Sequence, residues 1–458
     1  MHGLIRPALD PNFQPMAVVY RAYQQDAEQS GVRLVVAIER SAGQVSAWES
    51  RVFPEGTQDE RTINVFDRVV KTLLWARGGY RIKVSGHRGL YEHLKKAYTK
   101  TGSRAFDEDF MANVYEQPFE VVYAENPDDI AHSVEGASSV GRHLDGCRIG
   151  FDAGGSDRKV SAVIDGKDVY SEEVVWHPKI TPDPMYHYEG ILSAMKTAAS
   201  HMPRVDAIGV SSAGVYIDNR IMVASLFLKV NREDFKKHVK TMYIDIAKEI
   251  GDVPLVVAND GDVTALAGAM SLEKGNLLGI AMGTSEAGGY VDEHMNITGW
   301  LNELAFAPVD FNPDAMVDEW SGDYGCGVKY FSQDGVIKLA PAAGIHLNEN
   351  DSPADKLKVV QKELEAGNPE AAKIFESIGT YFGYGVAWYA LFYDIRHVLV
   401  MGRVTSGKGG TLLIQHAQEV LDRDFPELAK QIELHLPDEK SRRVGQSIAA
   451  ASLPEIRK

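Results

Sequence analysis

One stretch of the sequence places an acid, two glycines and a hydroxyl at a predicted strand–turn–strand. It covers residues 148–165, with Asp152 at the end of the first strand and Gly154, Gly155 and Ser156 in the turn. Glycines without side chains let the backbone N–H groups approach an anion closely, and the serine adds a hydroxyl. These residues are typical of a phosphate-binding hairpin whose carboxylate holds a metal ion or a water. The alternative is an ordinary hairpin turn with an unrelated aspartate.

Three further glycine-rich turns each follow a short apolar strand, at residues 209–214, 283–289 and 402–410. Ligands of α/β proteins bind at the carboxyl ends of strands, so the four turns together predict one binding cleft. The first and third turns join two strands of a hairpin. They therefore differ from the dinucleotide-binding fingerprint and from the P-loop, both of which open a helix.

Strands and helices alternate along the chain, which predicts an α/β fold. Strands are expected at 33–40, 45–53, 81–85, 118–123, 148–165 (a hairpin), 169–176, 205–214, 254–258, 277–282 with its partner at 290–292, and 394–401. Helices are expected at 16–23, 62–76, 86–98, 188–201, 232–250, from 260 to about 270, 369–393, 410–421 and 443–452.

An internal repeat is suggested by self-comparison of the chain. Residues 33–47 can be laid without gaps on residues 148–162, and 82–86 resembles 208–214. In the first copy Ala37 stands where Asp152 stands in the second, so that copy should not bind phosphate. The alternative is a chance match of two β-hairpins.

Length and composition indicate an ordinary cytoplasmic enzyme. A chain of 458 residues should form two or three domains. Its net charge of −16 argues against a nucleic-acid partner, which requires a basic face. No apolar run reaches the length of a membrane span, and the first residues lack the pattern of a signal peptide. The two cysteines form neither a disulfide framework nor a CxxC metal site.

The order of the motifs resembles the actin/hexokinase/Hsp70 ATPase superfamily and, within it, the ROK family of sugar kinases and repressors. The resemblance covers about residues 147–455 and follows Asp152-Ala-Gly-Gly-Ser, then Asn259-Asp260, then the glycine turns at 283 and 402. It implies two ribonuclease-H-like lobes with ATP and Mg²⁺ in a cleft between them. The implied lobes are 146–265 and 266–458, with the C-terminal helix returning to the first of them. Residues 1–145 would then be an extra α/β domain.

The resemblance also implies a role for each matching residue. Asp260 matches the catalytic base that accepts the proton of the attacking sugar hydroxyl, and Asp152 would face the Mg²⁺–phosphate group. The implied cofactor-binding residues are Gly154, Gly155, Ser156, Gly283 and Thr284 along the phosphates, with Gly402 and Gly407 in the turn beside the adenosine. The implied substrate-binding residues are Asn259, Glu303 and Ser212. The alternatives are that Asn259 and Asp260 only cap a helix, that Glu303 is a surface charge and that Ser212 belongs to a turn.

Two departures from the family pattern concern its zinc loop and its sugar contacts. Phe306 stands where the family carries a histidine, and Cys326 is the only cysteine left in the loop. One thiol cannot complete a four-ligand site, so no structural zinc is expected there. Despite these departures, the resemblance implies an ATP-dependent kinase of a sugar or related polyol. We expect it to form a homo-oligomer (a dimer) and to have no nucleic-acid or membrane partner. The alternative is a catalytically weak regulatory or scaffold protein of the same fold, and a DNA-binding repressor is less favoured.

Overall fold

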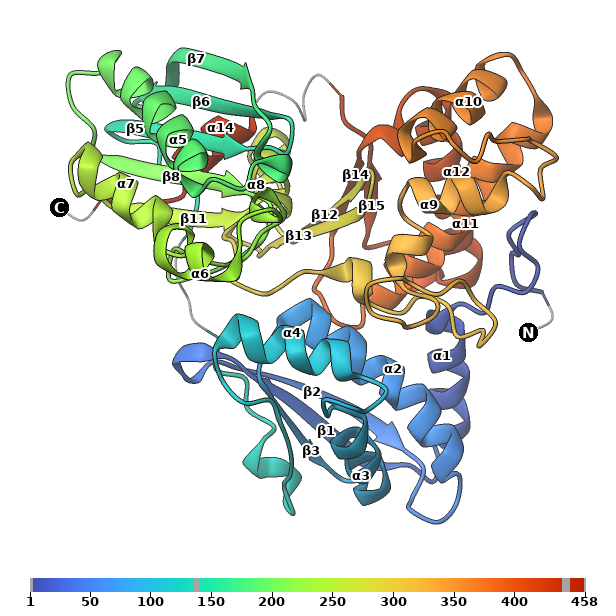
Figure 1. The fold of residues 1–458 in the computed structure, drawn as a ribbon. Coiled ribbons are helices and arrows are strands. Elements are labelled where there is room, and N and C mark those ends of the chain that lie inside the picture. The colour runs from blue at the N-terminus through green and yellow to red at the C-terminus, as the bar shows by residue number, and fades with distance from the viewer. Residues whose placement is uncertain (1–2, 136–139, 439–444, 457–458) are drawn as a thin grey trace. The chain divides into compact units, whose positions relative to one another are not determined.

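The computed structural model describes residues 3–135, 140–438 and 445–456 (Figure 1). The chain divides into two compact units. The first unit contains Met1–Gly136, Ile280–Gly288 and Trp300–Leu436, and the second contains Ala137–Gly279, Gly289–Gly299 and Pro437–Lys458. The three-domain division at residues 145 and 265 stays a prediction. Among the described residues, no helix is both long and apolar enough to cross a membrane.

The second unit is built on a five-stranded sheet with the order β11-β8-β5-β6-β7. Strands β5, β6 and β7 form an antiparallel meander, whereas β8 and β11 extend the other side of β5 in parallel. This is the strand order of a ribonuclease-H-like lobe. The strands are β5 (Cys147–Ala153), β6 (Asp157–Ile164), β7 (Lys167–Val175), β8 (Ala207–Ser212) and β11 (Leu255–Asn259), with a small hairpin of β9 (Val215–Ile217) and β10 (Arg220–Val223). The helices are α5 (Pro184–Ser200), α6 (Arg232–Asp234), α7 (Met242–Ile250), α8 (Asp260–Leu272) and α14 (Gln446–Ala451).

Helices cover both faces of this sheet (Figure 1). Ile149 and Phe151 of β5 share a buried core with residues of α5 and α7. Alternate residues of a strand point to opposite faces, so Gly150 faces the other side, where α14 lies. A Cβ on Gly150 would come within 1.7 Å of the Ser447 carbonyl oxygen. In β8, a Cβ on Gly209 would meet the Ala450 carbonyl oxygen at the same distance. Glycine is therefore required where the backbone of α14 rests directly on the sheet.

Replacement of Gly150 by alanine is expected to destabilise the protein by about 2 kcal/mol or more, because the added methyl group must push α14 off the sheet. Urea unfolding followed by circular dichroism measures the change. Gly445→Ala is the matched control. Gly445 is the N-cap residue of α14, and a Cβ there would meet nothing within 4 Å. Equal stability of the two variants would contradict the close approach.

One predicted helix of the second unit is interrupted. The sequence predicts a single helix at 232–250, but the structure has a π-helical stretch, Phe235–Val239, between α6 and α7. The Lys240 carbonyl accepts a hydrogen bond of 2.9 Å from the backbone N–H of Ile221 in β10. The Lys240 N–H in turn donates to the Phe235 carbonyl oxygen, five residues back, which is the π-helical pattern. The first residues of the helix predicted at 443–452 lie outside the described residues.

The first unit contains a mixed N-terminal sheet, most of a second four-stranded sheet and most of the remaining helices. The N-terminal sheet has the order β2-β1-β3-β4, and the other has the order β13-β12-β14-β15. The N-terminal elements are α1 (Met16–Ala27), β1 (Val32–Glu39), β2 (Val45–Val52), α2 (Asp59–Arg77), β3 (Arg81–Ser85), α3 (Arg88–Ala97), α4 (Ala105–Tyr115) and β4 (Glu120–Tyr123). The later elements are β12 (Leu277–Met282), β13 (Glu286–Val291), α9 (Gln333–Leu339), α10 (Pro353–Glu365), α11 (Pro369–Tyr389), β14 (His397–Met401), α12 (Lys408–Asp424), α13 (Pro426–Ala429) and β15 (Glu433–His435).

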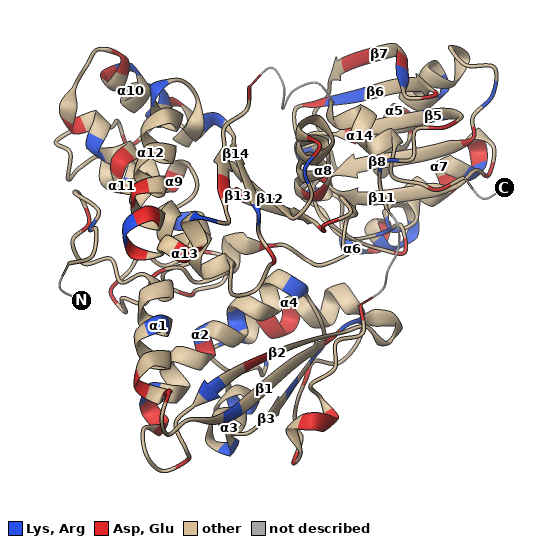
Figure 2. Cartoon of the chain, turned by 180° about the vertical axis from the view of Figure 1, so that it is seen from behind, with Lys and Arg blue, Asp and Glu red and all other residues tan. Residues whose placement is uncertain are grey.

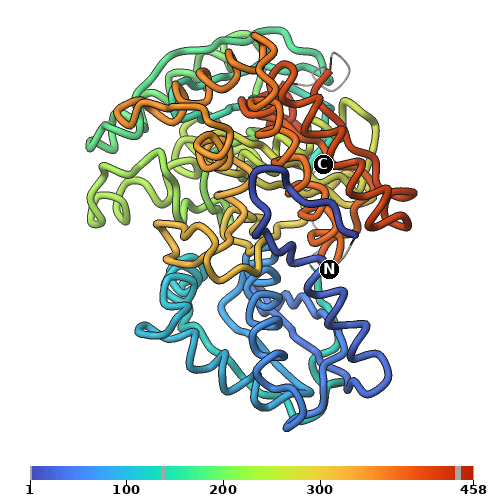
Figure 3. Tube along the Cα trace, turned by 90° about the vertical axis from the view of Figure 1, so that its right-hand side faces the viewer, coloured from blue at the N-terminus to red at the C-terminus, as the bar shows by residue number. Residues whose placement is uncertain are grey.

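The start of the chain runs beside helices from its far end (Figure 3). Tyr384 of α11 donates a hydrogen bond to the Ile5 carbonyl oxygen, and the backbone N–H of Leu9 donates to Ser377 of the same helix. Asp10 accepts hydrogen bonds from Tyr381 and from Lys338. These contacts tie the N-terminal segment to the C-terminal half of the sequence within the first unit.

The proposed internal repeat is not matched by the strand pairing. Strand β1 pairs with β3 antiparallel, whereas its counterpart β5 pairs with β8 in parallel. The hairpin registers also differ, since Ala37 pairs with Ala47 while the aligned Asp152 pairs with Lys159. The pairing therefore favours the alternative, a chance match of two hairpins.

Candidate functional site

Two acidic residues of the second unit lie at the carboxyl ends of β5 and β11, the strands on either side of β8. Asp152 of β5 pairs in register with Ser211 of β8, and Ser212 of β8 pairs with Asn259 of β11. Asp260 follows directly as the first residue of α8. The parallel pairing of β5, β8 and β11 thus brings together residues that are more than 100 positions apart in the sequence, as strand ends are expected to do.

Hydrogen bonds connect these strand ends to the C-terminal helix. The Ser211 hydroxyl donates to Asp152 Oδ1 at 2.9 Å. Gln446 of α14 donates through its side-chain amide to Ser211 Oγ at 2.9 Å and to the Asp260 carbonyl oxygen at 3.2 Å. Gln446 therefore links the Asp152 side to the Asp260 side. Neither Ser211 nor Gln446 is among the predicted site residues.

The protein raises the pKa of both carboxyl groups. Burial raises the pKa of Asp152 to about 6, against an opposing effect of the Ser211 hydrogen bond, and the nearby charge of Asp260 raises it further. Burial also raises the pKa of Asp260, while the hydrogen bond from the Gly261 N–H and the charge of Lys179 lower it. Two partly buried carboxylates with raised pKa values favour a bound cation or a proton. Carboxylate oxygens are the ligands that Mg²⁺ prefers, so these residues fit that ion.

Replacement of Asp152 by asparagine is expected to remove a pH dependence of stability. The pKa of about 6 lies above the ordinary value of 3.8, so the folded protein binds this proton more tightly than the unfolded chain does. Wild type should therefore lose stability relative to Asp152→Asn as the pH rises from about 4 to about 6, by up to about 3 kcal/mol. Urea unfolding of both proteins across this window, in metal-free buffer, measures the difference. Parallel pH profiles would contradict the raised pKa.

Asn259 is the N-cap residue of helix α8, so capping does not depend on Asp260. Asn259 Oδ1 accepts a hydrogen bond of 2.7 Å from the Gly261 N–H, and its Nδ2 donates to the Gly214 carbonyl oxygen at 2.8 Å. The capping alternative therefore accounts for Asn259. Asp260 Oδ1 adds a longer contact of 3.0 Å to the same N–H. A role for Asp260 beyond capping is left open by this arrangement.

The glycine hairpin is held by residues from the loop after β7. The Trp176 indole N–H donates to the Gly154 carbonyl oxygen at 2.8 Å. A Cβ on Gly155 would lie 2.8 Å from Nζ of Lys179, so the ammonium group rests against the turn. Ser156 is exposed and donates to Asp157 at 3.1 Å. Lys179 supplies a positive charge beside the predicted phosphate turn, and no motif in the sequence points to it.

Ser212 lies in the core rather than beside the carboxylates. Its hydroxyl is fully buried and accepts hydrogen bonds from Tyr216 at 2.6 Å and from Tyr243 at 3.2 Å. Successive residues of β8 point to opposite faces, so Ser211 takes the position beside Asp152. A direct contact between Ser212 and a substrate would require the tyrosines to move.

The predicted glycine turns of the first unit also come together at strand ends. Gly283 and Thr284 follow β12, and Gly402 follows β14, its neighbour in the sheet. A Cβ on Gly402 would lie 2.4 Å from the Met282 carbonyl oxygen, and its φ of 103° also favours glycine. Gly407, with φ of 65°, precedes the first residue of α12. The two turns are thus in direct contact.

A second pair of carboxylates, Glu286 (buried) and Glu303 (half-buried), lies near the first of these turns. Burial raises the pKa of Glu286 in β13 to about 8, and the charge of Glu303 contributes in the same direction. Tyr389 donates a hydrogen bond to Glu286 Oε1 at 3.3 Å. Glu303 is half-buried, so it is not simply a surface charge. Glu286 could have been noticed as the one acid within the glycine turn at 283–289.

The loop that carries Cys326 is fixed by buried ion pairs. Asp323 accepts hydrogen bonds from Arg68 and Lys71 of α2, both at 2.7 Å, and from Arg104 at 2.5 Å. Acidic and basic residues both occur along α2 (Figure 2). Nearby, Phe306 packs on Trp75 with ring centroids 4.4 Å apart. Residues of the N-terminal segment therefore contact Phe306 and the loop that carries Cys326, where the sequence departs from the family pattern.

Comparisons with known proteins identify the fold. No protein-family model matches the chain, and no curated protein matches it. Among solved structures, a ROK family transcriptional regulator, a homolog of the E. coli MLC protein, shares 17% identity over 68% of this chain and 79% of its own, with a TM-score of 0.50. A ROK hexokinase from Thermus thermophilus shares 17% identity over 67% and 97%, with a TM-score of 0.49. A ROK glucokinase from Streptomyces griseus, in complex with glucose and AMPPNP, shares 20% over 68% and 99%, with a TM-score of 0.47.

The predicted α/β fold of the actin-like ATPase kind is confirmed by the first of these matches and by the strand order of the second unit. The resemblance to ROK proteins is therefore confirmed as a resemblance of fold.

Proposed function

We propose that the chain is an ATP-dependent phosphotransferase that phosphorylates a hydroxyl group of a sugar or a sugar-like polyol. The observation that carries the proposal is the pair of carboxylates, Asp152 and Asp260, at the carboxyl ends of β5 and β11 in a ribonuclease-H-like sheet. Both pKa values are raised, and the hydrogen bonds of Gln446 link the two positions.

In this proposal Asp260 accepts the proton of the attacking hydroxyl. The hydroxyl oxygen forms a bond to the γ-phosphorus of ATP, the bond from that phosphorus to the β–γ bridging oxygen breaks, and ADP leaves. A raised pKa makes Asp260 a stronger base than an exposed aspartate. Asp152 would hold Mg²⁺, which neutralises phosphate charge when bound. Lys179 would add a positive charge beside the Gly154–Gly155 turn.

The remaining predicted roles belong to the same proposal. Backbone N–H groups of the hairpin at 154–156 and of Gly283 and Thr284 would contact the phosphates, and the turn with Gly402 and Gly407 would lie beside the adenosine. Glu303 would bind sugar hydroxyls. Asn259 would do so only by giving up one of the two hydrogen bonds that its side chain makes.

A substrate screen tests the proposal. Purified protein with ATP and Mg²⁺ is assayed for ADP release over a panel of aldoses, ketoses, amino sugars and polyols. At least one acceptor is expected to raise ADP release well above the rate without acceptor, and mass spectrometry should find its monophosphate. The proposal is contradicted if the protein binds ATP and no acceptor on the panel is phosphorylated.

A regulatory protein of the same fold is the second candidate. The packing of Phe306 on Trp75 favours it, because an apolar contact occupies the position at which the family carries a histidine. Such a protein would bind ATP or a sugar, detectable by calorimetry, without turnover. The predicted homodimer is tested separately by light scattering after size-exclusion chromatography.

A further inference from the structure

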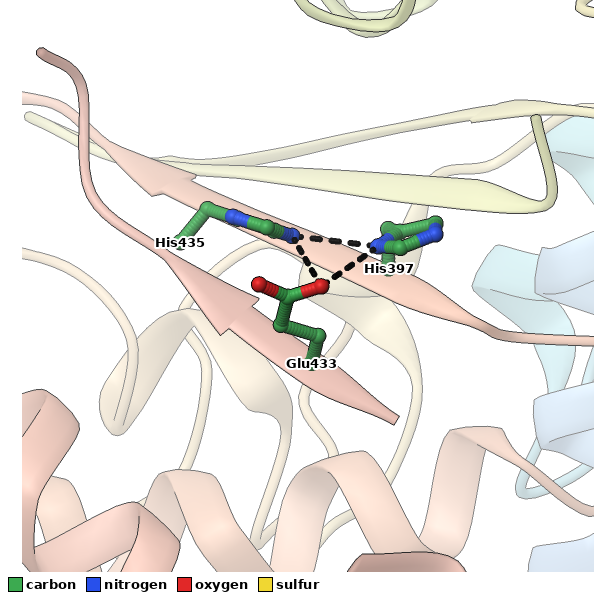
Figure 4. Close-up of side chains that lie close together, drawn as sticks. All are labelled: His397, Glu433 and His435. Carbon is green, nitrogen blue, oxygen red and sulfur yellow. Dashed lines mark hydrogen bonds and ion pairs between the residues drawn. The ribbon is translucent and has the colours of Figure 1, made fainter. Parts of the chain in front are cut away.

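Two histidines and a glutamate converge at the edge of the sheet that contains β14 and β15 (Figure 4). His397 Nδ1 lies 3.1 Å from His435 Nε2. Glu433 Oε2 lies 3.6 Å from His397 Nδ1 and 3.8 Å from His435 Nε2. One donor atom of each side chain thus points toward a common centre.

Strand pairing explains why these residues meet although His397 and His435 are 38 positions apart. Strands β14 and β15 are parallel, with His397 opposite Glu433 and Leu399 opposite His435. Glu433 and His435 are two residues apart, so both point to one face of β15. A residue opposite in register points to the same face, which places His397 there as well.

We propose that His397, Glu433 and His435 form a binding site for a divalent transition-metal ion of the Zn²⁺ class. Three ligand atoms bonded to one tetrahedral zinc ion at about 2.0–2.1 Å are separated from one another by about 3.3 Å. The three separations of 3.1, 3.6 and 3.8 Å bracket this value. Imidazole nitrogens with one carboxylate oxygen select Zn²⁺, Co²⁺ or Ni²⁺ over Mg²⁺ and Ca²⁺, which prefer oxygen ligands alone.

The burial pattern leaves one side of this site open. The side chains of His397 and His435 are only 15% and 17% exposed, whereas that of Glu433 is 66% exposed. Two ligands are therefore held by the fold, and the third can close over the ion from solvent. A fourth position can be filled by water.

The position of the site indicates a structural role. His397 begins β14, while the Gly402 turn follows its other end, five residues away. Strand β15 is only three residues long and lies at the edge of the sheet. An ion bound to one residue of β14 and two of β15 would fasten this short strand. The site is distinct from the Cys326 loop, for which the sequence predicts no zinc.

The test is a Zn²⁺ titration of the full chain after treatment with a chelator, followed by calorimetry. Wild type is expected to bind one Zn²⁺ per chain at these residues, with a rise in melting temperature. Glu433→Gln should weaken binding by about 10-fold or more, and the double variant His397→Ala/His435→Ala should abolish it, because ligand number sets the affinity. Competition with Mg²⁺ in large excess should leave Zn²⁺ binding unchanged.

His416→Ala is the matched control. His416 also lies beside two glutamates, 3.4 Å from Glu419 and 4.0 Å from Glu376, but has no second imidazole. Its loss should leave the affinity and the stoichiometry unchanged. If the double histidine variant does not fold, Glu433→Gln decides, because its exposed side chain can be changed without disturbing the core. The proposal is overturned if wild type binds no Zn²⁺, or if Glu433→Gln binds Zn²⁺ as tightly as wild type.

Discussion

Replacement of Asp260 by asparagine is expected to lower kcat by about 10³-fold while ATP still binds. An asparagine cannot accept the hydroxyl proton, and general-base catalysis contributes about 10²–10⁴-fold to such reactions. The variant should fold normally because Asn259, not Asp260, makes the shorter capping hydrogen bond to Gly261. Steady-state ADP release with the acceptor identified in the screen measures kcat, and calorimetry measures ATP affinity.

The pH profile separates loss of a base from a merely structural effect. Because the pKa of Asp260 is raised, wild-type activity should fall, as the pH is lowered, at a pH above the ordinary aspartate range. Asp260→Asn should lack this acidic limb. Asp355→Asn is the matched control, since Asp355 also lies in the first turn of a helix and is exposed. Residual kcat in Asp260→Asn above about a tenth of wild type would contradict the general-base role.

The parts of the site that the sequence predicts are those set by short-range patterns. Asp152 and Asp260 stand where a strand ends, and strand ends can be located from apolar runs followed by glycine or asparagine. The resemblance to ROK proteins supplied the order of these strands. The structure then places Asp152 and Ser211 in direct contact.

The parts that the sequence does not predict come from remote segments. Gln446 reaches the site because α14 returns to β5 and β8, and Lys179 belongs to a loop without a motif. The metal-ligand group of His397 and His435 depends on the parallel register of two strands. The sequence predicts Ser212 as the site residue of the pair Ser211–Ser212. Strand alternation sends the two side chains to opposite faces of the sheet, and the fold places Ser212 on the core side.

In the N-terminal segment, local sequence patterns likewise fail to predict how the strands pair. Its strands and most of its helices are close to those predicted, although helix α4 is not among them, and the pairing of β1 with β3 is antiparallel. Local apolar patterns specify that a strand exists but not the direction of its partner, because both directions bury the same face. The proposed repeat rested on local similarity alone, and the pairing direction argues against it.

The first unit holds its Cys326 loop through charges rather than through apolar contacts alone. Arg68, Lys71 and Arg104 surround Asp323, and all four side chains are less than a tenth exposed. The neighbouring cations hold the pKa of Asp323 well below its usual range despite burial. Arg104 also forms an ion pair with Asp67. Removal of one charge from such a group leaves its partners buried without compensation.

Asp323→Asn is therefore expected to destabilise the protein by about 3–5 kcal/mol, which is the usual effect of breaking a buried ion pair. Urea unfolding monitored by fluorescence gives the change in the free energy of unfolding. Glu319→Gln is the control from the same loop, because Glu319 pairs with Lys329 but is 76% exposed, and its loss should matter by less than about 1 kcal/mol.

A second substitution distinguishes the charge effect from a packing effect. In Asp323→Asn, Lys71 keeps its charge, and its remaining ion pair among the described residues is the longer one with Asp107, at 3.8 Å. Lys71→Met removes this positive charge at similar volume, so the double variant Asp323→Asn/Lys71→Met should recover part of the lost stability. Simple addition of the two single losses, or a loss below about 1 kcal/mol in Asp323→Asn itself, would show that the loop is held by packing and not by its ion pairs.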